Sequence, residues 1–138
     1  MSHSPNSLNY VAPVFRVADL GRSVSYLGRS VSYYRDQLGF EVEFTYEGFY
    51  AGVLRDGCHI HLKCAPRVER DQVAFETEEH LDACFGVQDV QALASIFESA
   101  GAAFAVPLRG MPYAREFYIK DPDGYILGFI QPAGAQDA

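Results

Sequence analysis

The stretch Val17–Leu20 (VADL) decides the fold, because a close variant, Val87–Val90 (VQDV), returns seventy positions later. In each place an apolar strand precedes the stretch and a helix-like segment follows it. Each helix-like segment ends in a glycine, and the strands after it include an Asp-Gly turn. The glycines are Gly39 and Gly101, and the turns are Asp56–Gly57 and Asp123–Gly124. Two copies of one strand–helix–strands unit predict a pseudo-symmetric protein.

A second repeat lies inside the first unit, where Leu20–Tyr26 (LGRSVSY) is followed at once by the identical Leu27–Tyr33. Apolar residues keep a helical spacing throughout Leu20–Leu38, which is typical of an amphipathic helix. The second unit has no such repeat, so one heptad of the first unit is extra. Seven added helical residues would displace one end of the helix by about 10 Å. We therefore expect Leu20–Tyr26 to extend beyond the sheet or loop out, while Leu27–Leu38 keeps the helix position.

The predicted elements follow the order βαβββ twice and form one α+β domain at residues 9–132. The first module spans about 9–65, a charged linker 66–80, and the second module about 81–132, between loose termini at 1–8 and 133–138. The expected strands are Tyr10–Val17, Phe40–Tyr46, Phe49–Leu54, Cys58–Ala65, Leu81–Val87, Ala103–Leu108, Arg115–Lys120 and Tyr125–Gln131.

Composition narrows the class of protein. The chain has 138 residues, 49% of them hydrophobic and 14% aromatic, which is enough for a sizeable core. The net charge of −7, without a basic cluster, argues against binding to nucleic acid or to anionic membranes. No apolar run approaches the roughly 20 residues of a membrane helix, no secretion signal is evident, and the three cysteines form no metal-type pair. We expect a cytoplasmic protein with reduced thiols.

Three stretches, Val17–Leu20, Tyr33–Phe40 (YYRDQLGF) and Arg115–Gly124 (REFYIKDPDG), together resemble the vicinal oxygen chelate superfamily. This superfamily includes glyoxalase I, extradiol dioxygenases, fosfomycin-resistance enzymes and bleomycin-resistance proteins. The resemblance implies two sheets curled around a cleft, with helices outside. It also implies a homodimer, in which half-units can be exchanged between partners.

In metal-binding members of this superfamily, four inward strand positions hold the ligands, usually His or Gln, Glu, His and Glu. The resemblance places these positions at Ala12, His61, Asp82 and Gly128. Only His61 and Asp82 carry groups that coordinate a metal, which is few for a tight site. We therefore expect no metal and no other cofactor; the alternative is a divalent metal held by His61, Asp82 and Glu116.

Strand alternation selects the side chains that can face the cleft. Between Cys58 and Cys64 the apolar residues face the helix, so His59 and His61 face the other way. In the second module Phe117 and Ile119 should pack under the helix, which leaves Glu116 and Tyr118 facing inward. The preceding segment, Arg109–Tyr113 (RGMPY), suits an adaptable loop over an apolar ligand. The candidate ligand-binding residues are His59, His61, Asp82, Tyr113, Glu116 and Tyr118.

These observations favour a small-molecule-binding protein of the bleomycin-resistance type that needs no metal. One alternative is a metal-dependent lyase, isomerase or dioxygenase that uses His61 and Asp82 with His59 or Glu116. The other is a non-enzymatic interaction domain with a vestigial cleft. One scaffold hosts many chemistries, so the fold does not choose between them.

Overall fold

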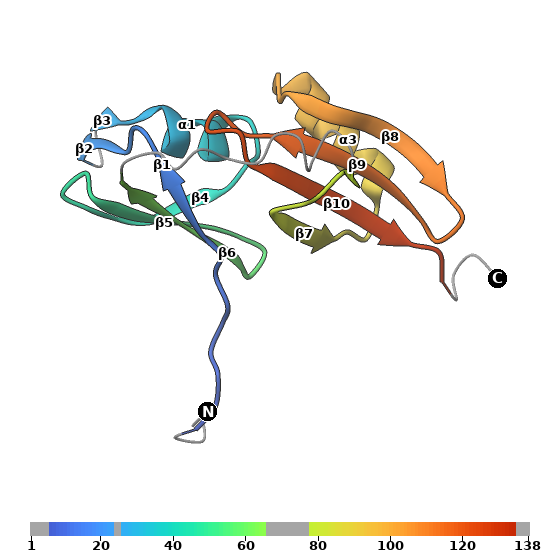
Figure 1. The fold of residues 1–138 in the computed structure, drawn as a ribbon, viewed down its shortest axis with the longest axis horizontal. Coiled ribbons are helices and arrows are strands. Elements are labelled where there is room, and N and C mark those ends of the chain that lie inside the picture. Colours follow the sequence, from blue (N-terminus) through green and yellow to red (C-terminus); the bar gives the residue numbers. More distant parts are fainter. Residues whose placement is uncertain (1–5, 24–25, 66–77, 135–138) are drawn as a thin grey trace.

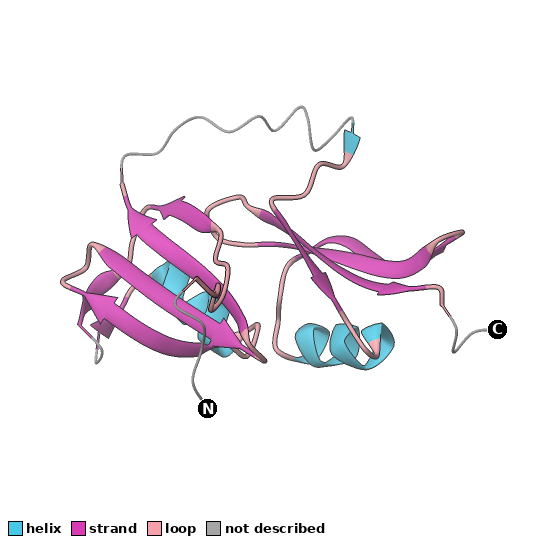
Figure 2. Cartoon of the chain, turned by 90° about the horizontal axis from the view of Figure 1, so that it is seen from below, coloured by secondary structure: helices cyan, strands magenta, loops and turns pink. Residues whose placement is uncertain are grey.

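The computed structural model describes residues 6–23, 26–65 and 78–134, without the side chains of residues 22–27. They form two modules, each a four-stranded sheet with one helix on one face (Figures 1 and 2). The first module contains β1 (Val14–Val17), α1 (Arg29–Asp36), β4 (Glu41–Tyr46), β5 (Tyr50–Arg55) and β6 (Cys58–Cys64). The second contains β7 (Ala83–Gly86), α3 (Val90–Ser99), β8 (Phe104–Met111), β9 (Ala114–Lys120) and β10 (Ile126–Pro132).

The two sheets have the same topology, which confirms the repeated βαβββ unit. Their strand orders are β1-β6-β5-β4 and β7-β10-β9-β8. In each sheet the first strand pairs in parallel with the last, and the other neighbours are antiparallel. Most of the expected linker lies outside the described residues, as do positions 1–5 and 135–138 of the termini.

The chain between Asp19 and Arg29 leaves the helix, whereas most of the second heptad copy lies inside it. The helix α1 begins at Arg29, and the residues before it form a short hairpin of β2 (Gly21–Ser23) and β3 (Tyr26–Leu27). The expected exit of the first copy from the helix is confirmed for Gly21–Ser23, but Leu20 stays buried in the core, and Leu27 of the second copy lies in β3 instead of the helix. Tyr33 of the second copy reaches the other module, where its hydroxyl donates to the carbonyl of Lys120.

Asp19 closes the base of this hairpin. Its Oδ2 accepts the N–H of Arg29 at 3.3 Å, and its carbonyl accepts the N–H of Ser30 at 3.4 Å. In the second module Asp89 caps α3 with the same two bonds, to the N–H groups of Ala92 at 3.1 Å and Leu93 at 3.1 Å. The partners stand three and four residues after Asp89, but ten and eleven after Asp19. The difference is seven residues, the length of one heptad. A stretch of that length therefore lies outside the helix, and the capping hydrogen bonds are kept.

Both glycines of the heptads are needed in this arrangement. Gly21 has a φ of +77°, in the region that favours glycine. A side chain at Gly28 would collide with the backbone N of Gly21 and with Asp19. Neither glycine lies inside a helix, so neither weakens α1.

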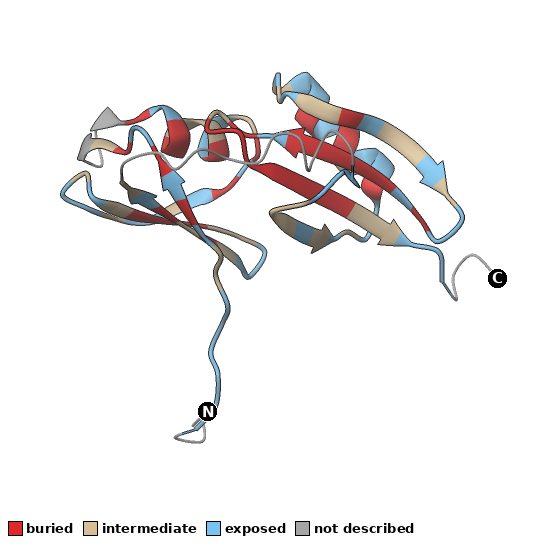
Figure 3. Cartoon of the chain, in the orientation of Figure 1, coloured by how far each residue is buried: buried red, intermediate tan, exposed pale blue. Residues whose placement is uncertain are grey.

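The core runs through both modules and is sealed by the turn before β10. Figure 3 shows buried residues along β9 and β10 and on the helices. Asp123 accepts the N–H of Ala18 at 3.0 Å and the hydroxyl of Ser30 at 2.5 Å. Asp121 accepts the Tyr34 hydroxyl at 2.6 Å. The second module is thus anchored to the start and middle of α1.

The predicted loop at Arg109–Tyr113 is wrong. The strand β8 continues to Met111, and a tight turn leads directly into β9 at Ala114. Gly110 pairs with Arg115 and Met111 with Ala114, so the segment forms a hairpin tip. Gly110 was misleading, because an edge strand tolerates glycine, whereas Pro112 lies in the turn itself.

Candidate functional site

The face of the first sheet that points away from α1 carries histidines and aromatic rings. The neighbours Ile60 and Leu62 are fully buried in the core beneath α1, whereas His59 and His61 lie on the other side of β6. Four rings on or beside this face remain more than a third exposed. They are Tyr10, Phe44, Tyr46 and Phe49. We call this surface, with Tyr50, His59 and His61, the aromatic face.

His61 lies at the centre of the aromatic face. Its Nδ1 is 2.9 Å from the hydroxyl of Tyr50, and the rings of Tyr50 and Phe44 meet the imidazole edge-on, with centroids 5.3 and 5.4 Å away. The Nε2 of His61 is buried and, among the described residues, has no hydrogen-bond partner. A buried imidazole nitrogen without a partner costs free energy that a ligand could recover.

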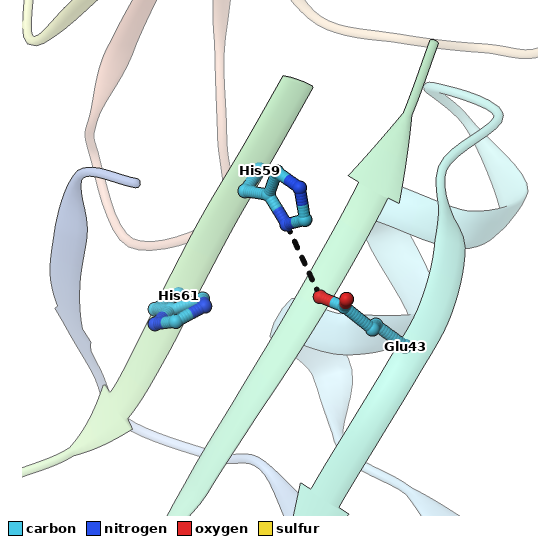
Figure 4. A group of neighbouring side chains, drawn as sticks. All are labelled: Glu43, His59 and His61. Atoms are coloured by element: carbon cyan, nitrogen blue, oxygen red, sulfur yellow. Dashed lines mark hydrogen bonds and ion pairs between the residues drawn. The ribbon is translucent and has the colours of Figure 1, made fainter. Parts of the chain in front are cut away.

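His59 lies one pleat away from His61 and forms its own cluster. Its Nδ1 is 3.2 Å from Oε1 of Glu43 on β4, as Figure 4 shows, and its ring stacks on Tyr10 at 4.0 Å. One potential ligand atom from each of Glu43, His59 and His61 lies within 4.8 Å of the others. Two histidines and a carboxylate are a donor set that transition metals accept.

A glycine shapes this face. Phe44 pairs with Gly52 of β5, and a side chain at Gly52 would collide with the Phe44 ring. The ring therefore lies across β5 and reaches His61.

The corresponding face of the second sheet centres on a buried carboxylate. Glu116 is fully buried, and its Oε2 accepts hydrogen bonds from Nε and Nη2 of Arg109 at 2.9 and 2.7 Å. The hydroxyls of Tyr118 and Tyr113 reach the same carboxylate at 3.2 and 3.5 Å. Arg109 also binds the exposed Glu79 at 2.8 Å. We call this group the Glu116 cluster.

The electrostatics of the Glu116 cluster follow from these contacts. Hydrogen bonds to Glu79 and Glu116 raise the pKa of Arg109 above its ordinary value. Burial, with the nearby charge of Glu116, raises the pKa of Tyr118 and that of the Cys84 thiol. Tyr118 therefore stays a hydroxyl that can donate a hydrogen bond.

The four positions where relatives bind a metal do not fit one in this chain. Ala12 offers no ligand atom. Asp82 accepts the N–H of Ile126 at 2.8 Å. A side chain at Gly128 would collide with Leu81, so this apolar residue fills the space of the fourth ligand. His61 still offers its Nε2, but one residue alone does not hold a metal ion tightly.

Five of the six candidate residues thus fall into two groups, one on each module. His59 and His61 belong to the aromatic face, whereas Tyr113, Glu116 and Tyr118 belong to the Glu116 cluster. The sixth, Asp82, lies in the second module, immediately before β7. The exposed side chain of Tyr113 stands at the tip of the β8–β9 hairpin.

Sequence reasoning missed Glu43 and Tyr50 on the aromatic face. The pairing of β4 with β5 shifts at a bulge between Val42 and Phe44, so simple alternation does not show that Glu43 meets His59. Tyr50 could have been found, because it begins the strand antiparallel to the one that carries His61.

The sequence model of the Glyoxalase/Bleomycin resistance protein/Dioxygenase superfamily matches residues 9–129. The chain belongs to this superfamily. Because the match spans both modules, the resemblance to vicinal oxygen chelate proteins is confirmed over the whole fold. A comparison with curated protein sequences gives no match.

Solved structures of the superfamily share the fold at low identity. A glyoxalase/bleomycin resistance protein/dioxygenase from Alicyclobacillus acidocaldarius has a TM-score of 0.67 at 16% identity, covering 96% of both chains. TnmS3, an antibiotic-binding protein from Streptomyces sp. CB03234, has a TM-score of 0.61 at 19% identity and covers 95% of this chain and all of its own.

A third structure is the bleomycin-binding protein from Streptomyces verticillus, complexed with copper(II)-bleomycin. It has a TM-score of 0.60 at 23% identity and covers 91% of this chain and 98% of its own. These likenesses show the fold of the superfamily. None of the helices in the described part of the chain is both long and apolar enough to cross a membrane.

Proposed function

We propose that this protein binds a small organic molecule on the aromatic face and needs no metal to do so. The observation that carries the proposal is the exposure of several rings around a buried histidine nitrogen that has no partner among the described residues. Exposed aromatic rings can stack on planar ligands, and the imidazole supplies one directional hydrogen bond. The antibiotic-binding relatives support this class of ligand.

We further propose that the working form is a homodimer in the cytoplasm, without nucleic-acid or membrane partners. A monomer that leaves Tyr46 60% and Phe49 51% exposed presents an apolar surface that a second subunit can cover. The Glu116 cluster of a partner subunit would supply the polar wall opposite the aromatic face. The ligand would then lie between one module of each subunit.

Calorimetry on the purified, metal-analysed protein tests the proposal. A panel of aromatic antibiotics that includes metal-free bleomycin should contain at least one saturable binder, and chelator treatment should not change its Kd. His61→Ala should weaken binding about tenfold, the cost of one buried hydrogen bond. His61→Gln, which keeps a hydrogen-bonding group, should weaken it less.

His80→Ala, a change at an exposed histidine outside the aromatic face, is the matched control and should bind like the wild type. Light scattering on the same samples reports the oligomeric state. A panel without binders, or one whose binding is unaffected by His61→Ala, would reject the proposal.

A second candidate function rests on Glu43, His59 and His61, whose donor atoms lie close together. In this alternative a divalent metal occupies the aromatic face and supplies Lewis-acid chemistry to a lyase, isomerase or dioxygenase. Stoichiometric metal in the purified protein that is lost in both His59→Ala and Glu43→Gln would favour it over metal-free binding.

A further inference from the structure

The two modules differ at one pair of equivalent positions. Beside β1 the position is filled by Tyr125, whereas beside β7 the equivalent position is an open hollow; we call each of these two positions a socket. The turn Asp123–Gly124 is followed by Tyr125, whereas the equivalent turn Asp56–Gly57 is followed by Cys58. Each turn lies beside the first strand and helix of the opposite module. The two turns therefore face equivalent surroundings with very different side chains.

In the filled socket Tyr125 makes three contacts with β1. Its ring stacks on Phe15 with a centroid distance of 4.2 Å and an interplanar angle of 9°. Its hydroxyl accepts the N–H of Arg16 at 2.8 Å and donates to the carbonyl of Arg16 at 2.9 Å. A phenol is thus held by one ring and one backbone edge.

The open socket has the same parts except for the tyrosine. By the repeat, Phe85 stands for Phe15 and Gly86 stands for Arg16. A hollow of about 500 Å³ lies here, within the range of small-molecule pockets. Its lining includes Cys58, Phe85, Gly86, Leu93, Ile96 and Phe129.

Two observations show that, among the described residues, no other side chain takes the place of the tyrosine in the second socket. A Cβ placed on Gly86 would meet no atom within 4 Å among the described residues. The side chain of Asp56 is 86% exposed and pairs with its neighbour Arg55, whereas the equivalent Asp123 is buried against α1. The first turn therefore does not close onto α3.

The backbone edge that binds the phenol is also present. Val87 donates its N–H to the carbonyl of Ile130 on β10. Because successive residues of a parallel strand direct their N–H and C=O groups to opposite sides, those of Gly86 point away from β10, as those of Arg16 point away from β6. Phe85, stacked on Phe129 at 5.0 Å, supplies a fixed platform.

We propose that this socket is a second ligand site, and that it binds the hydroxylated aromatic ring of a small molecule. The ring would stack on Phe85, and its hydroxyl would bind the N–H and carbonyl of Gly86, as Tyr125 does at Arg16. The socket lies beside α3 and apart from the aromatic face. Its test is independent of the proposed function.

The test uses p-cresol, which is the tyrosine side chain itself, as the probe. Titration into ¹⁵N-labelled protein should give saturable shifts of the Gly86 amide and its neighbours at millimolar concentrations. Toluene, which lacks the hydroxyl, should bind at least threefold more weakly. Shifts that do not saturate, or that avoid residues 85–89, would overturn the proposal.

Variants of the socket complete the test. Cys58→Tyr rebuilds the symmetric tyrosine and should abolish the p-cresol response, whereas Cys58→Ser should keep it. Ala92→Phe places a ring in the socket from the exposed surface of α3 and should also abolish the response, so it decides the question if Cys58→Tyr fails to fold. Undiminished binding in Ala92→Phe would reject this site.

Discussion

At the scale of single residues, Asp121 shows how a buried carboxyl can serve structure and still respond to pH. Its Oδ1 accepts the N–H groups of Asp123 and Tyr125, both at 2.9 Å, and its Oδ2 accepts the Tyr34 hydroxyl. Burial outweighs these bonds and raises the pKa of Asp121 from 3.8 to about 6. The folded protein therefore holds this proton more tightly than the unfolded chain.

The consequence is a loss of stability as pH rises. The contribution of Asp121 is fully present below about pH 4 and is lost through pH 6, for a change of about 2–3 kcal/mol. Asp121→Asn should remove this dependence. From pH 4 to 7 the free energy of unfolding of the variant should therefore rise by about that amount relative to the wild type. Urea unfolding at several pH values measures it. A difference that is constant with pH would contradict the assignment.

Arg109 is the residue that makes the buried Glu116 tolerable. Removing its charge with Arg109→Met should destabilise the protein by about 3 kcal/mol or more, because a fully buried carboxylate loses its ion pair. The double variant Arg109→Met/Glu116→Met should recover much of that loss. Chemical denaturation measures both.

Glu79→Gln is the control for this pair. It removes the exposed partner of Arg109 and should cost less than about 1 kcal/mol. An equal loss from Glu79→Gln and Arg109→Met would show that Glu116 does not need the guanidinium.

At the scale of elements, the duplicated heptad gives a direct prediction. Deleting Leu20–Tyr26 or Leu27–Tyr33 yields the same polypeptide, in which Asp19 stands three residues before Arg29 and caps α1 as Asp89 caps α3. The deletion should keep the circular-dichroism spectrum and change stability by about 1 kcal/mol or less, toward the stable side, because Leu27 can take the place of the buried Leu20 and the shorter connection costs less loop entropy. Loss of folding would mean that the hairpin of β2 and β3 carries structure.

The elements also show what could be read from the sequence. Repetition and alternation located the sheets, the helix-facing residues Phe117 and Ile119, and the two histidines on the opposite face. The start of α1 could not be read, because the heptad keeps a helical spacing of apolar residues even where it leaves the helix. The β8–β9 hairpin tip was missed because Gly110 is a turn former that an edge strand also accommodates, so the strand runs on to Met111 and only Pro112 and Tyr113 form the turn.

At the scale of the whole molecule, the two modules share one core and should unfold together. The Tyr125 hydroxyl allows this to be tested, because it hydrogen-bonds to β1 across the interface between the modules. Tyr125→Phe keeps the stack on Phe15 but should cost about 1–2 kcal/mol for the two hydrogen bonds. The urea transition should remain single and shift to a lower midpoint. Two separate transitions would show that the modules are independent.

Tyr113→Phe is the matched control. Its side chain is 58% exposed, and its bond to Glu116 is long, at 3.5 Å, so the midpoint should hardly move.

The sequence assigns His61 and Glu116 to different modules, but the spacing between the two parts of the candidate site was beyond sequence reasoning. The repeat indicates equivalent positions in each half, but it does not fix how far apart the halves hold them. His61 and Glu116 depend on contacts far apart along the chain, such as that between Tyr125 and Arg16, and single-sequence periodicity carries no information on those.

The closure of the excursion by Asp19 has a practical consequence. A segment whose two ends are hydrogen-bonded to one carboxylate is a suitable site for inserting a foreign peptide. An epitope or affinity tag inserted between Gly21 and Leu27, which leaves the buried Leu20 in place, should be displayed on the surface while the fold stays intact.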